Sequence, residues 1–273
     1  MKQDPTGHGF DKRHIFEFDV FGYTILRNFL PAEMVGTMNT ILDARLEGHA
    51  VKKFPFLNLD PVFWDLMSHP RVMNICRYLL GAGFRLDSTF GIQFEAAASE
   101  TPAGREDLHA GPFASQGAFR YAWYDNKPQC GQIVCVYYLE DVEEGDGGLV
   151  LVPGSHKMNV AISGPSIHKD ILKAKMEAWW LHNPAMKAGD LLIFTEAVVH
   201  GTQTWKNTRH RRRNLQYCYG PPCQAQRDYE QIRKFLPLAR NDTERDLLRP
   251  PYALRYGDAK VAQGENEWRS PVR

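Results

Sequence analysis

The sequence predicts a mainly β fold with flanking helices, whose core is an antiparallel barrel or jelly roll. From about Phe84 to Tyr219, short apolar runs alternate with clusters of Gly, Pro and Asp, which is typical of short strands joined by turns. The segments on either side of this region have the apolar spacing or the composition of helices instead. The predicted strands are Phe90–Phe94, Ile133–Leu139, Leu149–Val152, Leu191–Phe194 and Leu215–Tyr219.

The region before the barrel predicts one strand followed by two helices. Tyr23–Leu30 is apolar and β-branched, which favours a strand. After Pro31, apolar residues recur at helical spacing as far as Leu42. A second helix is predicted between Pro70, which suits a first helical turn, and Gly81, which stops a helix well. We expect both helices to support the barrel.

Two more helices are predicted from composition. One covers residues 170–181 and should cross over the barrel, and the other covers residues 224–236 near the C-terminus. The last thirty or so residues are rich in Arg, Pro and Gly and are predicted to be irregular. No internal repeat is visible.

The composition favours one large domain spanning residues 1–273. Of the 273 residues, 43% are hydrophobic and 24% are charged, which is enough for a substantial core. The formal net charge of +1 implies no general attraction to a nucleic acid polymer or to a membrane surface. The sequence does not indicate an oligomeric state.

The cysteines and the N-terminal residues indicate the cellular compartment. The five cysteines have no paired CxxC spacing, so we expect reduced thiols. The first residues lack the uninterrupted apolar stretch of a signal peptide, and no run approaches the roughly 18 residues of a membrane span. A soluble, cytoplasmic protein is therefore expected.

Three short motifs carry the functional signal. They are DLHAGP at Asp107–Pro112, GGLVLVPGSHK at Gly147–Lys157, and GDLLIF at Gly189–Phe194, which runs on to HGT at His200–Thr202. Their order and texture resemble the phytanoyl-CoA dioxygenase family, over roughly Phe16–Tyr219. The resemblance implies a double-stranded β-helix of the cupin-like kind and an enzyme that uses Fe(II), 2-oxoglutarate and O2.

The same resemblance implies a metal site. In the family, two histidines and usually one carboxylate bind iron and leave three coordination positions open. His109 and His200 fall at the positions of the two histidines. A lone histidine is more often a half-buried packing residue, and it is the flanking motifs that favour the ligand interpretation here. His156 of PGSHK is expected to organise the loop after a strand instead.

The arginine-rich run from Arg209 to Arg213 has two interpretations. A nucleic-acid patch is one, although so short a run is more often a solvated hairpin. The resemblance implies that one arginine, about eleven residues after the second histidine, pairs with the distal carboxylate of 2-oxoglutarate. Counting from His200 indicates Arg211, whereas alignment with the family's RR-x-L-x-Y strand indicates Arg212, which we prefer. Both cannot face the barrel unless a bulge intervenes.

The chain departs from the family at Gly111. Most members have Asp two residues after the first histidine, but glycine has no side chain to bind iron. The chain could have lost catalysis and become a binding module, or a carboxylate such as Glu106 or Asp107 could be recruited. Alternatively chloride occupies the vacated position, as in Fe(II)-dependent halogenases, which have Gly or Ala there. Chloride would restore the missing negative charge, so a halogenase is the first expectation and a hydroxylase the second.

The sequence defines the substrate poorly beyond a small molecule. With glycine at position 111, the chain resembles the nucleotide halogenases of nucleoside-antibiotic biosynthesis, which act on a deoxyadenosine monophosphate. A phosphate would need basic partners, and a base would need aromatic ones; the candidates are Arg120, Lys127, Lys157, Phe113, Trp123 and Tyr124. The plainer interpretation, which we prefer for these residues, is ordinary surface charges and core aromatics.

Overall fold

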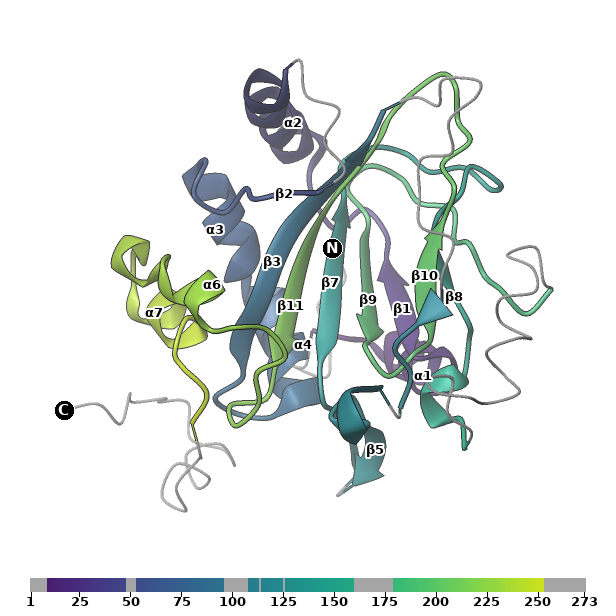
Figure 1. Ribbon diagram of the computed structural model, residues 1–273, viewed down its shortest axis with the longest axis vertical. Helices are drawn as coiled ribbons and strands as arrows, with labels where there is room; N and C mark the ends of the chain where they lie inside the picture. Colours follow the sequence, from purple (N-terminus) through teal and green to yellow (C-terminus); the bar gives the residue numbers. More distant parts are fainter. Residues whose placement is uncertain are drawn as a thin grey trace.

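The computed structural model describes residues 9–47, 53–95, 108–112, 114–124, 126–159 and 179–252. Within these residues, two antiparallel sheets form the walls of a jelly roll, and helices cover the outer face of the larger sheet (Figure 1). The predicted mainly β fold with flanking helices is confirmed. None of the described helices is long and apolar enough to cross a membrane.

The larger sheet has six strands in the order β1-β9-β7-β11-β3-β2, and the smaller has three in the order β4-β10-β8. A separate hairpin consists of β5 and β6. The five predicted strands overlap β3, β7, β8, β9 and β11. In chain order the strands are β1 Tyr23–Leu26, β2 Lys53–Phe54, β3 Arg85–Phe94, β4 Leu108–His109, β5 Tyr121–Tyr124, β6 Lys127–Cys130, β7 Ile133–Tyr138, β8 Gly148–Leu151, β9 Leu191–Thr195, β10 His200–Gln203 and β11 Arg212–Gly220.

Side chains of the larger sheet alternate between two separate cores, because successive residues of a strand point to opposite faces. On β7, Cys135 and Tyr137 pack toward the helices, whereas Val134 and Val136 pack toward the smaller sheet. On β11, Leu215 packs toward the helices. Cys218 packs toward the smaller sheet. Every second residue of β11 counted from Cys218, back to Arg212, therefore faces the interior of the jelly roll.

Helices α2, α3 and α4 pack their apolar faces on the outer side of the larger sheet. The two predicted helices before the barrel correspond to α2 and α4. Helix α1 was not predicted, although Asp11 caps its first turn by accepting a hydrogen bond from the backbone N–H of His14 (2.9 Å). The described helices are α1 Lys12–Phe21, α2 Ala32–Leu46, α3 Pro61–Met67, α4 Pro70–Leu80, α6 Glu230–Arg233 and α7 Asp242–Leu247.

Tyrosine hydroxyls join α3 to the sheet. Tyr217 and Tyr219 of β11 and Tyr137 of β7 donate to the backbone carbonyls of Phe63, Met67 and Leu66, at 2.6, 2.6 and 3.1 Å. Leu66 and Met67 lie in the last turn of α3, where carbonyls lack partners within the helix, and a buried hydroxyl also needs a partner.

The predicted helix over residues 224–236 is wrong in its extent, because only Glu230–Arg233 is α-helical. Residues of the chain before it bond to distant segments of the protein. The side-chain amide of Gln224 donates to the carbonyls of Ala118 and Gly131, and the backbone N–H of Gln226 donates to Asp87. Of the predicted helix over residues 170–181, only residues 179–181 are described, and these are not helical.

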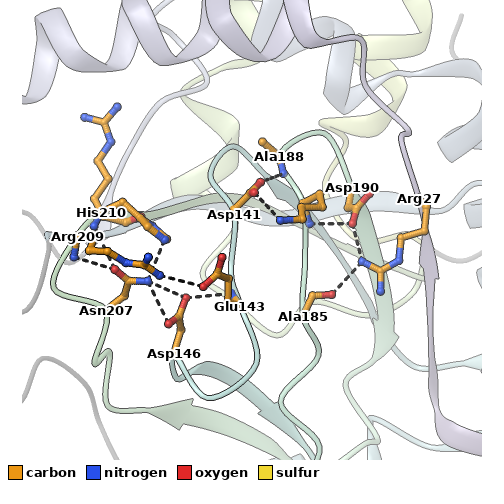
Figure 2. Close-up of polar contacts among 12 residues, drawn as sticks. Arg27, Asp141, Glu143, Asp146, Ala185, Ala188, Asp190, Asn207, Arg209 and His210 are labelled. Carbon is orange, nitrogen blue, oxygen red and sulfur yellow. Dashed lines mark hydrogen bonds and ion pairs between the residues drawn. The ribbon is translucent and has the colours of Figure 1, made fainter.

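The aspartate of the GDLLIF motif has a structural position. Asp190 is 1% exposed and accepts from the guanidinium of Arg27 (2.6 Å), from the backbone N–H of Asn28 (2.9 Å) and from that of Lys187 (2.9 Å). Figure 2 shows the pair with Arg27. The carboxylate thus links the segment after β1 to the turn before β9. The five cysteines, all in described residues, are free thiols as predicted.

Candidate active site

The short pairing of β4 with β10 brings two of the predicted site residues together. His109 and His200 are direct register partners in this ladder, although they are far apart in the sequence. Their ring centroids lie 4.4 Å apart, with the ring planes tilted by 60°. His200 is 7% exposed and packs against the edge of Phe194, whereas His109 lies on an exposed edge strand. Two imidazoles this close can share one ion.

The hydrogen bond of His200 decides its tautomer. The Nδ1 atom lies 2.9 Å from the backbone carbonyl oxygen of Val198, which can only accept. The proton is therefore on Nδ1, and Nε2 has a free lone pair, which is the form that binds a metal. Burial lowers the pKa of His200 to about 4, so the ring is neutral near pH 7.

A carboxylate that the sequence analysis missed lies beside this pair. Glu196 is in the turn between β9 and β10, and its Oε1 is 3.8 Å from Nε2 of His200. Burial raises its pKa to about 7, against the opposing effects of His109 and Arg227. The one sequence signal was an isolated charge within the apolar run from Leu191 to Val199.

The backbone of the His-Ala-Gly triplet turns sharply. Ala110 and Gly111 both have positive φ, at 64° and 98°. Side chains other than glycine's are strained in this region, so an aspartate at position 111 would not fit this backbone without cost. The turn lets the N–H of Gly111 donate to the backbone carbonyl of Glu196 (3.4 Å). Glu106 and Asp107, the alternatives considered from sequence, lie outside the described residues.

Arg211 and Arg212 face opposite sides of the larger sheet. Arg211 turns outward, where it pairs with Glu140 (2.8 Å) and Asp43 (2.7 Å). Arg212 points inward, is 1% exposed, and has no hydrogen-bond partner for Nε or Nη1 among the described residues. Burial lowers its pKa, an effect that Tyr138 partly offsets. The alternation on β11 favours Arg212 over Arg211 as the residue that meets a ligand.

The loop before β11 is held by Asn207, as Figure 2 shows. Its amide nitrogen donates to both carboxylate oxygens of Asp146 (3.0 Å each), and its amide oxygen accepts from the backbone N–H groups of Arg209 and His210. Arg209 itself pairs with Glu143 at the surface. These contacts set the start of β11, and with it the face on which Arg212 lies.

A cavity of about 190 Å³ connects the histidines to Arg212. Its walls mix apolar side chains with amides and hydroxyls. The lining residues are Ser88, Phe90, Ile92, His109, Gln132, Val134, Leu149, Phe194, Glu196, His200, Gly201, Thr202, Arg212, Gln216, Cys218 and Arg227. The cavity is smaller than the roughly 300–1,000 Å³ of sites that enclose a drug-sized ligand. It suits a small organic acid better than a whole nucleotide.

The suggested substrate-binding residues lie elsewhere. Among the described residues, the cavity lining includes neither Trp123, which is 49% exposed, nor Arg120. Lys127, Lys157 and Tyr124 are also absent from the described lining. Phe113 lies outside the described residues.

Basic groups that the sequence analysis did not select are closer to the cavity. Arg227 lines it, and the Nζ of Lys53 lies 3.6 Å from the ring centroid of Phe90, which also lines it. Neither residue is part of a motif, so the sequence held no signal for them.

Comparison with known families decides the assignment. The family profile described as phytanoyl-CoA dioxygenase (PhyH) matches residues 18–213, more than half of the chain. The chain belongs to the phytanoyl-CoA dioxygenase family. It is accordingly a non-haem iron and 2-oxoglutarate-dependent enzyme of the oxygenase type.

Solved structures agree with the fold of this phytanoyl-CoA dioxygenase family member. HygX from Streptomyces hygroscopicus with iron bound is 22% identical, with a TM-score of 0.66 over 80% of this chain and 90% of HygX. The epimerase SnoN, in complex with Fe3+, alpha ketoglutarate and nogalamycin RO, is 18% identical, with a TM-score of 0.57 over 78% of this chain and 84% of SnoN. At these identities the likeness concerns the fold alone. No curated protein sequence matches the chain significantly.

Proposed function

We propose that this enzyme oxidises a C–H bond of a small molecule, with His109 and His200 as iron ligands and Arg212 as the partner of 2-oxoglutarate. The observation that carries the proposal is the buried guanidinium of Arg212, whose Nε and Nη1 lack partners among the described residues. A buried, unpaired charge is costly, so this position favours a carboxylate ligand. The cavity that holds Arg212 also holds both histidines.

The residues of the site fit the cofactors of the family. His200 offers a neutral Nε2, and a planar guanidinium can hold a carboxylate through two parallel hydrogen bonds. When bound, iron with 2-oxoglutarate supplies the activation of O2 that amino acid side chains cannot provide. The protein then has to orient 2-oxoglutarate through Arg212 and keep the imidazoles in their metal-binding tautomer.

The substrate is proposed to bind at the mouth of the cavity, near the exposed His109. The cavity volume of about 190 Å³ leaves little room for more than a small acid inside it. Arg227 and Lys53 carry positive charge on this side, so a substrate with an anionic group is favoured. Structures of the same fold contain hygromycin B in HygX and nogalamycin RO in SnoN, which is consistent with a small-molecule substrate. A nucleotide remains a candidate within this class.

Oxygen transfer is placed ahead of halogenation, the reverse of the order expected from sequence. Halogenation needs an anion site at the metal where Gly111 leaves a gap. Glu196 lies beside that gap, and a metal ion bound there would keep its carboxylate ionised, so its negative charge would repel chloride. Halogenation stays as the second candidate because Gly111 itself offers no ligand.

Anaerobic reconstitution with iron(II) and 2-oxoglutarate, followed by O2 and a panel of small metabolites and nucleotides, tests the proposal. We expect succinate and an oxygen-containing product in chloride-free buffer. A chlorinated product that requires chloride would establish the second candidate. Failure to bind iron(II), together with no 2-oxoglutarate-dependent visible absorption, would reject both.

A further inference from the structure

The carboxylate missing at position 111 has a neighbour in space that could replace it. Of the carboxylates in the described residues, Glu196 is the one that lines the cavity with His109 and His200. Its Oε1 is 3.8 Å from the Nε2 atom of His200, the atom that carries the free lone pair. A carboxylate oxygen beside two imidazoles is the donor set of a two-histidine, one-carboxylate metal site.

The backbone holds Glu196 next to the gap. Its N–H donates to the carbonyl of Gln132 (3.0 Å), and its carbonyl accepts from the N–H of Gly111 (3.4 Å). The turn is closed by Val198, whose N–H donates to the carbonyl of Thr195 (2.9 Å). The main chain of Glu196 is thus hydrogen-bonded directly to the residue that lacks the aspartate.

We propose that Glu196 is the carboxylate ligand of the metal and replaces the aspartate that Gly111 cannot supply; this inference rests on the proposed iron-dependent function. In the described part of the chain, no three His, Cys, Asp or Glu side chains are already arranged to hold a metal. The three ligands would therefore come together only when the ion binds, by rotation of the Glu196 side chain toward the two histidines. Its main chain stays fixed by the bonds to Gln132 and Gly111.

Two physical arguments support glutamate in this place. The positive φ of Gly111 disfavours a side chain there, which favours a carboxylate from another part of the chain, such as the turn between β9 and β10. Glutamate also keeps the single negative charge of the usual aspartate, so the net charge around a divalent ion is unchanged. A halide is then not needed to balance the metal.

The test is titration of the protein with Co(II) in chloride-free buffer, followed through the visible d–d absorption of the bound ion. The variants are Glu196→Gln, which keeps the volume and removes the charge, and Glu143→Gln, an exposed control whose carboxylate pairs with Arg209 at the surface. We expect wild type and the control to bind one Co(II) alike. Glu196→Gln should bind Co(II) more weakly by roughly 10–100-fold or more. Substitution of residues that only hydrogen-bond to metal ligands already lowers metal affinity by this amount. The spectrum of Glu196→Gln should also change.

The effect of chloride distinguishes Glu196 as the metal ligand from a halide bound at the position that Gly111 leaves open. Added chloride should leave Co(II) binding by wild type unchanged, because Glu196 already supplies the negative charge. It should strengthen binding by Glu196→Gln, where an anion can replace the lost carboxylate. Circular dichroism and thermal unfolding of the metal-free proteins check that the variant is folded, and Glu196→Asp, which keeps the charge on a shorter side chain, should recover part of the affinity.

Co(II) binding by wild type tests the proposed iron site, and the comparison with Glu196→Gln tests the role of Glu196. If wild type binds no Co(II), the proposed iron site is wrong and the inference falls with it. If wild type binds Co(II), but folded Glu196→Gln binds it equally well with the same spectrum, only the role of Glu196 is overturned. Chloride-dependent binding by wild type would overturn it as well and would favour a halide site.

Discussion

A β-carbon on Gly148 would lie 2.8 Å from the Nε of Arg212, so the second glycine of the Gly147–Gly148 pair makes room for the buried guanidinium. The distance is shorter than real contacts of a β-carbon, and the guanidinium cannot move away easily because Arg212 is enclosed. Strand β8 of the smaller sheet therefore shapes the side-chain position of a residue on the larger sheet.

Gly148→Ala should weaken 2-oxoglutarate binding by displacing Arg212. Gly145→Ala is a matched control, because Gly145 has a similar positive φ (87° against 90°), but among the described residues other than its chain neighbours no atom lies within 4 Å of its added β-carbon. Both variants should lose about 1–2 kcal/mol of stability from backbone strain. Only Gly148→Ala should raise the 2-oxoglutarate concentration at half-maximal charge-transfer absorption. Equal binding by both variants would contradict this role of Gly148.

Arg212→Met should weaken 2-oxoglutarate binding, whereas Arg211→Met should not. Losing the buried partner of a carboxylate costs about 2–5 kcal/mol, so Arg212→Met should weaken 2-oxoglutarate binding by roughly thirtyfold or more. Without ligand, the same variant should be as stable as wild type or more stable, because it removes an unpaired buried charge. Arg211→Met should leave binding intact. Calorimetry of both variants, with and without 2-oxoglutarate, measures these effects, and equal binding losses would refute the assignment.

His109→Ala and His200→Ala should each abolish iron(II) binding and turnover. Wild type should bind one iron(II) per chain, measured by metal analysis after anaerobic loading. His109 lies on an exposed edge strand, so its variant should also unfold at nearly the wild-type temperature when metal is absent. Near-normal activity in either variant would show that the metal is held elsewhere.

Asp190→Ala should lower the free energy of unfolding by about 1.5–3 kcal/mol, the usual contribution of hydrogen bonds to a charged group. Its carboxylate is buried, pairs with Arg27 (Figure 2), and also accepts from the backbone N–H groups of Asn28 and Lys187. Asp141→Ala, on the neighbouring loop, is the control, because Asp141 is half-exposed and pairs with Lys187 in solvent. Urea denaturation should show a clearly smaller loss for the control.

His156 should make stability depend on pH on the acid side. Burial lowers its pKa to about 4, an effect that the neighbouring Lys157 reinforces and Asp19 opposes. The unfolded chain, with a histidine pKa of about 6.5, then binds the proton more readily than the folded chain. The stabilisation is complete above pH 6.5 and is lost as the pH falls toward 4.

His156→Gln tests this dependence, because its amide nitrogen can still donate to the carbonyl of Asp19 as Nε2 of His156 does (3.0 Å). Between pH 6.5 and 4, the free energy of unfolding should fall less steeply in the variant, by up to about 1.4 kcal/mol per pH unit. Urea denaturation at several pH values measures both slopes. Equal slopes would mean that His156 does not titrate on unfolding.

The fold was predictable from sequence to the extent that local patterns determine it. Apolar runs of four to seven residues bounded by turn residues located β3, β7, β8, β9 and β11, because strands buried on both faces need largely apolar sequence. The preference for Arg212 over Arg211 came from the alignment with the family's RR-x-L-x-Y strand, and the alternation of side chains required only that the two residues face opposite sides. The helix over residues 224–236 failed because Gln224 and Gln226 bond to the barrel, a long-range contact that no local pattern contains.

Glu196 could not be identified from sequence for a similar reason. Its significance depends on a hydrogen bond to Gly111, which lies far away along the chain, and on the side of the turn to which its carboxylate points. The sequence showed the gap at Gly111 clearly, but the nearest acidic residues in sequence were Glu106 and Asp107. Proximity along the chain was a poor guide because β4 and the turn before β10 meet only in the folded protein.

In the part of the chain that the structure describes, the ladder between β4 and β10 consists of two residue pairs, His109 with His200 and Leu108 with Gly201. An ion shared by the two histidines would be a cross-link across about ninety residues of chain, comparable in its effect on the unfolded state to a disulfide that closes a long loop. Loss of the ion would then release the end of the smaller sheet first, while β7, β9 and β11 stay paired. The metal of this enzyme would in that case help to hold the active site together before any substrate arrives.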